Sequence, residues 1–565
     1  MALKRNITVN WLSILLHLFL LATITLLVFQ RHQNTGYFNW RSKMWGDAAG
    51  YYVYSPALFI YKFDAAKLPE KITEKTGEGF VVNEKGKIIT RYSCGIAILQ
   101  SPVFLATHWL AGLTDQKQDG FSGIYHLVSS IAAIIYSFFG ILLLWYFLRY
   151  YFKRWVALLT IITIFLGTNL LYYTIDATGM SHVYSFFLFA LLLVLSKKYF
   201  IEKRSKQQLI YFIFISFVSS LIILVRPTNV VFVVLVFLLD ISSLQELKSR
   251  VKQVFTPSNF VILVVSAFIV FLPQMLYWKY SSGSLITNSY EGYGFTNWAT
   301  PKIKEFLFST NNGLFTYNPL YFVFVIALIF MIVKKQRNGW YIMLTFAGLI
   351  YVYSSWFIFS FGCGFGSRNF VEYTTVFALP LGYFYMNFLK KDIFRWVLIG
   401  SLIFLMVLVN VKLTSSYNKC FIDGDWNWEE YKYLLKARKY DKTLTFSQAF
   451  SLNDKRDYSE SINITVDKIT KVNFRRAIVK TKLRIYEKDT QASIVFQIAA
   501  RDTLIYWNGV EIAKQFSENE IGKYKLIKGD FWLPKHYTVN SEISTFIWNR
   551  GKDSLDIKKI KVHLE

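Results

Sequence analysis

Long apolar runs separated by short polar loops fill most of the first 415 residues. A helix needs about 20 mainly apolar residues to cross the hydrocarbon core of a bilayer. The first run is too long for the core of a cleavable signal peptide and lacks a small-residue cleavage site, so we expect it to remain as a span. The pattern predicts eleven spanning helices, at 11–29, 127–149, 155–175, 182–197, 208–225, 229–242, 258–279, 318–333, 339–360, 373–390 and 395–413.

Basic residues gather in every second loop between these runs. Because Lys and Arg are enriched on the cytoplasmic side of membrane proteins, these loops are expected inside the cell. The N-terminus is then inside, and the residues after 415 are outside. The clusters are Lys4/Arg5, Lys153/Arg154, Lys197/Lys198/Lys203/Arg204/Lys206, Lys248/Arg250/Lys252, Lys334/Lys335/Arg337 and Lys390/Lys391/Arg395.

The first external loop is long, at about 30–125, and holds two more apolar stretches. Counting 95–113 as a span would move every later basic loop to the wrong side. We therefore expect this stretch to lie flat in the membrane interface, and 51–63 to do the same. Between them, VVNEKGKII predicts a small hairpin. A loop of this length is usually functional.

The last part of the chain changes character. After a linker with a predicted short surface helix (416–440, the helix at 426–439), runs such as SIVFQIAA and EISTFIWN alternate apolar and polar residues with period two. Polar turns separate them at regular intervals, which predicts an antiparallel β-sandwich of the jelly-roll kind at 441–565. Such a module binds carbohydrate or serves as a structural docking unit.

Composition agrees with a membrane protein: 54% of residues are apolar, 19% aromatic and only 18% charged. The net charge of +27 sits mostly in short loops, which does not favour a nucleic-acid-binding protein. The three cysteines, Cys94, Cys363 and Cys420, show no spacing typical of a zinc site. Cys94 and Cys363 both fall outside the cell, so a disulfide between them is one pairing to test.

Several ionisable residues converge on the external side of this topology. Charged groups at the edge of a membrane are costly and point to function. The pattern therefore predicts an active or binding site at the outer boundary, roofed by loops. Its candidates are Asp47, Asp176, Ser181, His182, Arg226, Glu291, Arg368 and Glu372.

Six segments, in this order, resemble bacterial members of the GT-C glycosyltransferase superfamily, in the branch of protein O-mannosyltransferases and lipid A aminoarabinose transferases. They are WGDAAGYYVYSPAL, RYSCGIAILQSPVFLATHWLAG, GMSHVYSFFLFAL, RPTN, NGLFTYNPL and FGCGFGSRNFVE. The resemblance covers about residues 1–415. It implies a mainly α polytopic bundle that transfers a hexosyl or pentosyl group from a polyprenyl-phosphate carrier, with inversion, to a glycan, lipid or protein acceptor.

The resemblance gives Asp47 the place of the family's first-loop acid, and we expect it to be the general base, with a pKa raised by the apolar boundary. Arg226 and Arg368 are expected to hold the donor phosphate, because a guanidinium binds two phosphate oxygens. His182, Asp176 and Glu291 are weaker candidates for substrate binding. Many members have a second acid beside the first, where this chain has Ala48, so no metal ligand is assigned and a divalent metal ion is left open.

Each candidate also has a structural explanation. Asp47 could cap a helix, Arg226 could reach the headgroups, and Glu372 could pair with Arg368 four residues earlier. Two other functions stay open: a carrier or flippase for lipid-linked glycans, and a membrane-anchored carbohydrate-binding or assembly protein. In every case we expect a multi-pass protein, in the plasma membrane of a bacterium, with the β-sandwich outside.

Overall fold

The computed structural model describes residues 11–32, 37, 42–114, 116–202, 204–290, 292–388, 393–417, 428, 431–432, 435, 444–452, 457–465, 476–500, 503–533 and 541–564. The chain divides into two compact units, Met1–Lys436 and Ala437–Glu565. The first is helical and the second consists of β-sheets. The predicted surface helix at 426–439 lies largely outside the described residues.

Every predicted span contains a helix of the first unit. The helices that correspond to these spans are α1 (Trp11–His32), α6 (His126–Leu148), α7 (Arg154–Gly167), α8 (Leu170–Ile175), α9 (His182–Ile201), α10 (Ser205–Val225), α11 (Val230–Leu238), α13 (Pro257–Ser282), α16 (Leu320–Val333), α17 (Gly339–Ser354), α18 (Thr374–Phe388) and α19 (Ile393–Ser416). The span predicted at 155–175 is broken into α7 and α8, because Thr168 adopts an extended conformation.

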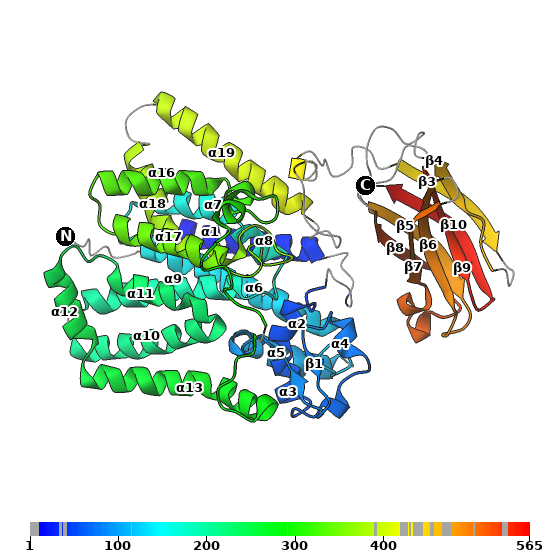
Figure 1. Ribbon diagram of the computed structural model, residues 1–565, viewed down its shortest axis with the longest axis horizontal. Coiled ribbons are helices and arrows are strands. Elements are labelled where there is room, and N and C mark those ends of the chain that lie inside the picture. Colours follow the sequence, from blue (N-terminus) through cyan, green and yellow to red (C-terminus); the bar gives the residue numbers. More distant parts are fainter. Residues whose placement is uncertain are drawn as a thin grey trace. The chain divides into compact units, whose positions relative to one another are not determined.

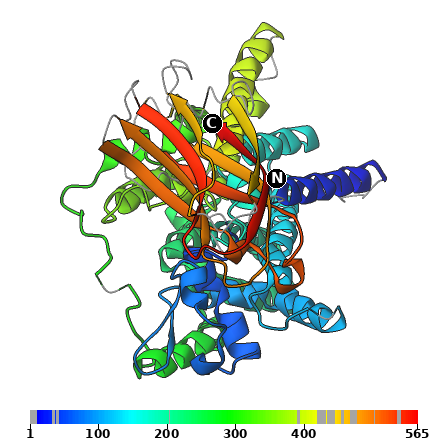
Figure 2. The ribbon, with the colours of Figure 1, turned by 90° about the vertical axis from the view of Figure 1, so that its right-hand side faces the viewer.

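Seven helical segments in the described part of the chain are long and apolar enough to cross a membrane. Six of them match predicted spans, and the seventh is α5 (Gly95–Leu113), which the sequence placed in the interface. The other predicted spans form shorter helices. In Figure 1, α9, α10 and α13 lie lengthwise, whereas α5 is seen near its end; in Figure 2 it runs across the end of the bundle. This transverse direction favours the interfacial placement.

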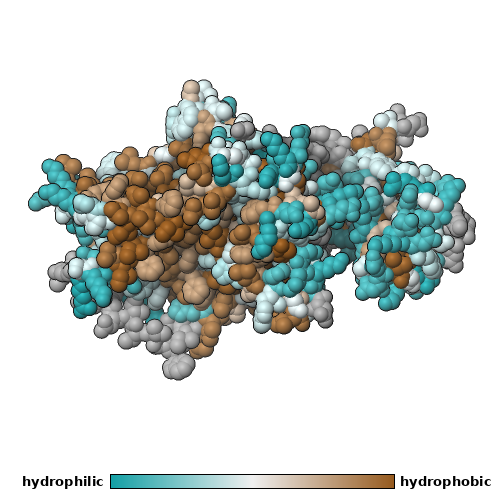
Figure 3. Space-filling model, turned by 90° about the horizontal axis from the view of Figure 1, so that it is seen from below, coloured by the Kyte–Doolittle hydropathy of each residue, from teal (hydrophilic) through white to brown (hydrophobic). Residues whose placement is uncertain are grey.

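The surface of the first unit is broadly apolar, as the brown region in Figure 3 shows. Helix α13 is the clearest case, since only 17% of its span is buried. It begins at Thr256, whose side chain accepts a hydrogen bond from the backbone N–H of Asn259, and it ends at Gly283 with φ of 85°. Exposed side chains such as Phe260 and Val264 would be unfavourable in water but suit lipid. The first unit is therefore an integral membrane bundle.

The described part of the loop between α1 and α6 forms a compact layer at one end of this bundle. It contains α2 (Asp47–Tyr52), α3 (Tyr54–Phe59), the 3-10 turn η1 (Ala65–Lys67), α4 (Ile72–Lys75), β1 (Val81–Val82), β2 (Ile88–Ile89), α5 and η2 (Gly123–Tyr125). The predicted hairpin is confirmed, with Val81 opposite Ile89. The stretch predicted as a single interfacial helix at 51–63 is instead divided between α2 and α3, which bury most of their side chains.

The remaining short elements lie in the loops between the long helices. They are η3 (Pro227–Asn229), the amphipathic helix α12 (Leu244–Val254), α14 (Ile303–Phe308), α15 (Leu314–Tyr317) and η4 (Arg368–Phe370).

The second unit is a β-sandwich of two four-stranded antiparallel sheets. Their strand orders are β3-β10-β5-β8 and β4-β9-β6-β7. Successive strands therefore cross between the sheets as in a jelly roll, except β6 and β7, which are neighbours in one sheet. Apolar residues of alternate positions, among them Ile494, Phe496 and Phe531, fill the space between the sheets. The strands are β3 (Leu444–Leu452), β4 (Ile462–Thr465), β5 (Arg476–Ile485), β6 (Ala492–Ala500), β7 (Thr503–Glu511), β8 (Lys525–Trp532), β9 (Ser541–Asn549) and β10 (Leu555–Leu564), with the turns η6 (Ala513–Gln515) and η7 (Glu518–Glu520) between β7 and β8.

Candidate active site

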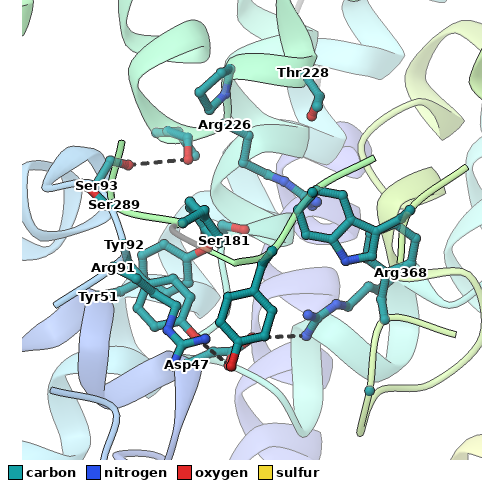
Figure 4. A pocket seen from close by; sticks show the side chains of 18 of the residues that line it. Asp47, Tyr51, Arg91, Tyr92, Ser93, Ser181, Arg226, Thr228, Ser289 and Arg368 are labelled. Carbon is teal, nitrogen blue, oxygen red and sulfur yellow. Dashed lines mark hydrogen bonds and ion pairs between the residues drawn. The ribbon is translucent and has the colours of Figure 1, made fainter. Parts of the chain in front are cut away.

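A cavity of about 670 Å³ opens at the end of the helical unit that carries the first loop. Its wall comes from α2, the segment before α5, the start of α9, the ends of α10, α13 and α17, and η4 (Figure 4). Five of the predicted residues line it, although most are far apart in the chain: Asp47, Ser181, His182, Arg226 and Arg368. The convergence expected from the topology is thus present in the structure.

Asp47 begins α2, directly after Gly46, which has a φ of 54°. Its Oδ1 accepts a hydrogen bond from the Tyr92 hydroxyl at 2.5 Å, and its Oδ2 accepts one from Arg368 Nη1 at 3.1 Å. Its side chain is 34% exposed, so it is reachable from the cavity. Asp47 is therefore neither the N-cap of α2 nor an isolated acid.

The pKa of Asp47 differs from the expectation of a raised value. Burial acts to raise it, but the charge of Arg368, the hydrogen bonds from Tyr92 and Arg368, and the charge of Arg91 outweigh burial, so the pKa is lowered from the ordinary Asp value. Burial and the Asp47 charge together raise the pKa of Tyr92, which stays a hydrogen-bond donor. A lowered pKa favours the ionised carboxylate, and the two hydrogen bonds hold it in place.

Arg368 is placed by the glycine-rich loop that follows α17. Gly362 and Gly366 have φ values of 68° and 63°, which glycine adopts without strain. At Gly364, a Cβ atom would come within 2.8 Å of the Tyr173 hydroxyl, so the close packing needs glycine here too. The loop turns Arg368 toward Asp47 and not toward Glu372, so the pairing of Arg368 with Glu372 was wrong.

Glu372 belongs to a second cluster beside the first. Its side chain is fully buried; Oε1 lies 3.3 Å from Arg226 Nη1, and Oε2 lies 3.0 Å from His182 Nδ1. Arg226 also donates to Asn369 Oδ1. The backbone of Arg226 is extended because Pro227 follows it, and α10 therefore ends at Val225. The Arg226 side chain forms part of the cavity wall.

Asp176, another candidate, is not among the residues that line the cavity. Asp176 ends α8 and forms an ion pair with Arg31 at 2.7 Å, and Arg31 also donates to the backbone oxygens of Ser415 and Tyr417. This contact joins α1 and α8 to the end of α19, which is a structural role. Glu291 lies outside the described residues.

Residues of the segment before α5 also line the cavity, and the sequence had not singled them out. They include Arg91, Tyr92 and Ser93, to which α2 adds Tyr51. Arg91 lies over the Tyr293 ring, 5.0 Å from its centroid. The sequence carries no signal that distinguishes Arg91, because the same long loop also contains Arg31, Arg41 and many lysines, and the positive-inside tendency applies to short loops.

The charges of the lining favour an anionic ligand. The described wall contains three guanidinium groups, on Arg91, Arg226 and Arg368, and one carboxylate, on Asp47. Apolar and aromatic side chains, such as Trp278 and Trp356, complete it. No group of three or more His, Cys, Asp or Glu residues that could hold a metal ion occurs in the described ranges.

Cys363, in the glycine-rich loop, is disulfide-bonded, whereas Cys94 is a buried free thiol. The pairing of Cys94 with Cys363 is therefore wrong, and the partner of Cys363 lies outside the described residues. Disulfides persist in oxidising compartments and are rare in the cytosol. The bond thus agrees with an external position for this end of the bundle.

No protein-family model matches this sequence, and no curated protein matches it. Among solved structures, the oligosaccharyltransferase AglB of Archaeoglobus fulgidus, in complex with an inhibitory peptide and a dolichol-phosphate, is 14% identical with a TM-score of 0.45. The match covers 76% of this chain and 60% of the archaeal one. The apo form gives a TM-score of 0.43 at 14% identity, over 75% and 60% of the two chains.

Proposed function

We propose that this protein is a glycosyltransferase that moves a hexosyl or pentosyl group from a polyprenyl-phosphate donor to an acceptor at the outer boundary of the membrane. The observation that carries the proposal is the cavity at the end of the apolar bundle, where a held carboxylate faces three arginines. A polyprenyl phosphate combines an anionic phosphate with an apolar chain, and the wall of this cavity combines cationic guanidinium groups with apolar and aromatic side chains. The motifs that resemble GT-C enzymes add support.

Arg226 and Arg368 bind the donor phosphate. Both are held by acids in the structure, Arg226 by Glu372 and Arg368 by Asp47. Glu372 is fully buried, whereas Asp47 is partly exposed, so the pair that can open toward a ligand is the one between Arg368 and Asp47. When Arg368 turns to the phosphate, Asp47 loses its nearest cation and becomes a better proton acceptor.

Asp47 then acts as the general base. It accepts the proton of the acceptor hydroxyl while the acceptor oxygen bonds to the anomeric carbon. The bond from that carbon to the phosphate oxygen breaks, and the lipid phosphate leaves with the electron pair, held by the arginines. One displacement of this kind inverts the anomeric centre. Tyr92 keeps its hydrogen bond to the carboxylate and fixes its direction.

The proposal places the cavity and the jelly-roll unit outside a bacterial plasma membrane, with a glycan, lipid or protein as acceptor. The alternation of basic loops supports this orientation. A divalent ion bound beside Asp47 would stabilise the leaving phosphate, and the described wall offers that single carboxylate for it.

The test incubates purified protein with a panel of radiolabelled polyprenyl-phosphate sugars and a membrane extract as the source of acceptor, with and without EDTA. The expected result is transfer of label by the wild type and loss of transfer by Arg368→Ala. Donor binding without transfer, together with donor movement across vesicles, would instead identify a carrier or flippase.

A further inference from the structure

The outer face of one sheet of the jelly roll carries a group of aromatic rings that the transfer chemistry does not use. On β9, the residues Ile543, Thr545 and Ile547 point into the sandwich, so Phe546 and Trp548 lie on its outer side. Trp507 of β7 is on the same side, because it is paired across the strands with Gln497. Tyr458 is bridged to Trp548 from the other edge. We call Tyr458, Trp507, Phe546 and Trp548 the aromatic face.

The rings of this face pack against one another at two orientations, because the indole of Trp507 is inclined by 79° to that of Trp548. Tyr458 and Trp548 are nearly parallel, with an interplanar angle of 10° and centroids 6.3 Å apart. The indole of Trp507 lies over Gly509, where an added Cβ atom would meet it at 3.4 Å, and it abuts Trp548 at 5.9 Å. Tyr458 and Trp507 remain 55% and 46% exposed. Gly509 thus lets the indole lie along the sheet with its other surface free.

A row of polar side chains runs beside the rings. Ser544 of β9 lies two residues before Phe546. It is paired with Asn463 of β4 on one side and with Gln497 of β6 on the other. These side chains make no hydrogen bond to another residue in the part of the chain that the structure describes. Their amide and hydroxyl groups are therefore free to bind a ligand. Residues two apart on a strand are separated by about 6.7 Å, so the polar row lies directly beside the rings.

The charged residues around the aromatic face indicate which class of ligand it can bind. Arg550 lies over Trp548, 5.2 Å from the ring, while Glu542 and Glu511 border the same side of the sheet. An anionic membrane or a nucleic acid would require clustered Lys and Arg, which this face lacks. An apolar protein surface would leave the free polar row without partners, which is costly. A saccharide has apolar C–H surfaces for the rings and hydroxyls for the row.

We propose that the aromatic face and the polar row of Asn463, Ser544 and Gln497 bind a neutral saccharide chain. This site is separate from the transfer cavity and goes beyond the proposed function. It would hold glycan at the protein whether or not the cavity is occupied, so it can be tested without any transfer assay.

The experiment titrates the full-length protein in detergent with mannohexaose, cellohexaose, chitohexaose and maltohexaose, and follows binding by calorimetry. We expect at least one to bind, and Trp507→Ala to weaken that binding by about tenfold or more. Gln497→Ala should weaken it as well, and it serves if Trp507→Ala does not fold. The matched control is Leu526→Ala, which removes an exposed apolar side chain from β8 of the other sheet.

The proposal is overturned if the wild type binds none of the four hexasaccharides, or if Leu526→Ala weakens binding as much as Trp507→Ala. It is also overturned if Trp507→Ala changes the oligomeric state, or retention on vesicles of phosphatidylglycerol, while sugar binding is unchanged. Those results would identify a protein or lipid contact instead.

Discussion

Asp47→Asn tests the proposed base most directly, because asparagine keeps the shape of the side chain and its Oδ1 can still accept from Tyr92. The contact with Arg368 is lost, since the amide nitrogen that replaces Oδ2 is a hydrogen-bond donor and cannot accept from the guanidinium. That ion pair is 3.1 Å long, but one partner is 34% exposed, so solvent reduces its net contribution to about 1 kcal/mol or less. We therefore expect little loss of stability.

The expected kinetic effect is much larger. A positioned base contributes roughly 10²–10⁴-fold in rate, which corresponds to about 3–5 kcal/mol. Donor affinity should be unchanged or stronger, because Arg368 no longer has to leave a carboxylate. The assay measures transfer at saturating donor beside donor binding by filter retention. A transfer rate within a few-fold of wild type would refute the role of Asp47 as base.

The pH profile of the same reaction gives a second check. The pKa of Asp47 is lowered, so its carboxylate stays ionised at any pH above the usual pKa of Asp. It becomes protonated only when the pH falls through the lowered pKa. The free enzyme should therefore show no loss of kcat/KM from this group between about pH 5 and 7. A wild-type profile that falls in this range, and a flat one for Asp47→Asn, would contradict the lowered pKa.

Four further outcomes are expected. Arg368→Lys should raise the donor Kd about tenfold, because lysine cannot bind two phosphate oxygens at once, and an unchanged Kd in a binding assay would exclude this contact. Glu372→Gln should destabilise the protein by about 3–5 kcal/mol, seen as a lower temperature of thermal aggregation, because Arg226 would keep a buried charge without its partner. A reporter fused after Glu565 should be active outside the cytoplasm, and activity only inside would reverse the topology. A fragment of residues 437–565 should give the circular dichroism spectrum of a β-protein, and a mainly helical spectrum would count against an independent sandwich.

Much of the fold was accessible from the sequence because its main determinants are local. Apolar runs marked every long helix, and period-two alternation marked the strands β6 to β10. The strand order was not accessible, since alternation shows which face is buried but not which strands are neighbours. The length of an apolar run does not by itself identify a membrane span. Helix α5 is long and apolar enough to span, yet it runs across the end of the bundle.

The site was predicted in part. The predicted topology placed Asp47, Arg226 and Arg368 on the same side of the membrane, and in the structure all three line one cavity. Their partners could not be predicted, because Asp47 and Arg368 are separated by 321 residues. The pKa of Asp47 was misjudged for the same reason: burial was foreseen, but the nearby guanidinium was not. Spacing suggested the pair of Arg368 and Glu372, which assumed a helix where the chain forms a tight turn.

The exposure of α13 has a consequence for how the proposed lipid-linked donor would reach the cavity. Only 17% of the apolar stretch of this helix is buried, yet Gln274 and Trp278 from the same helix line the cavity. A lipid-linked donor would thus arrive by diffusion within the plane of the bilayer, a two-dimensional search. The relevant substrate concentration is then its mole fraction among the lipids. Adding inert lipid or detergent at constant bulk donor should slow the reaction by surface dilution.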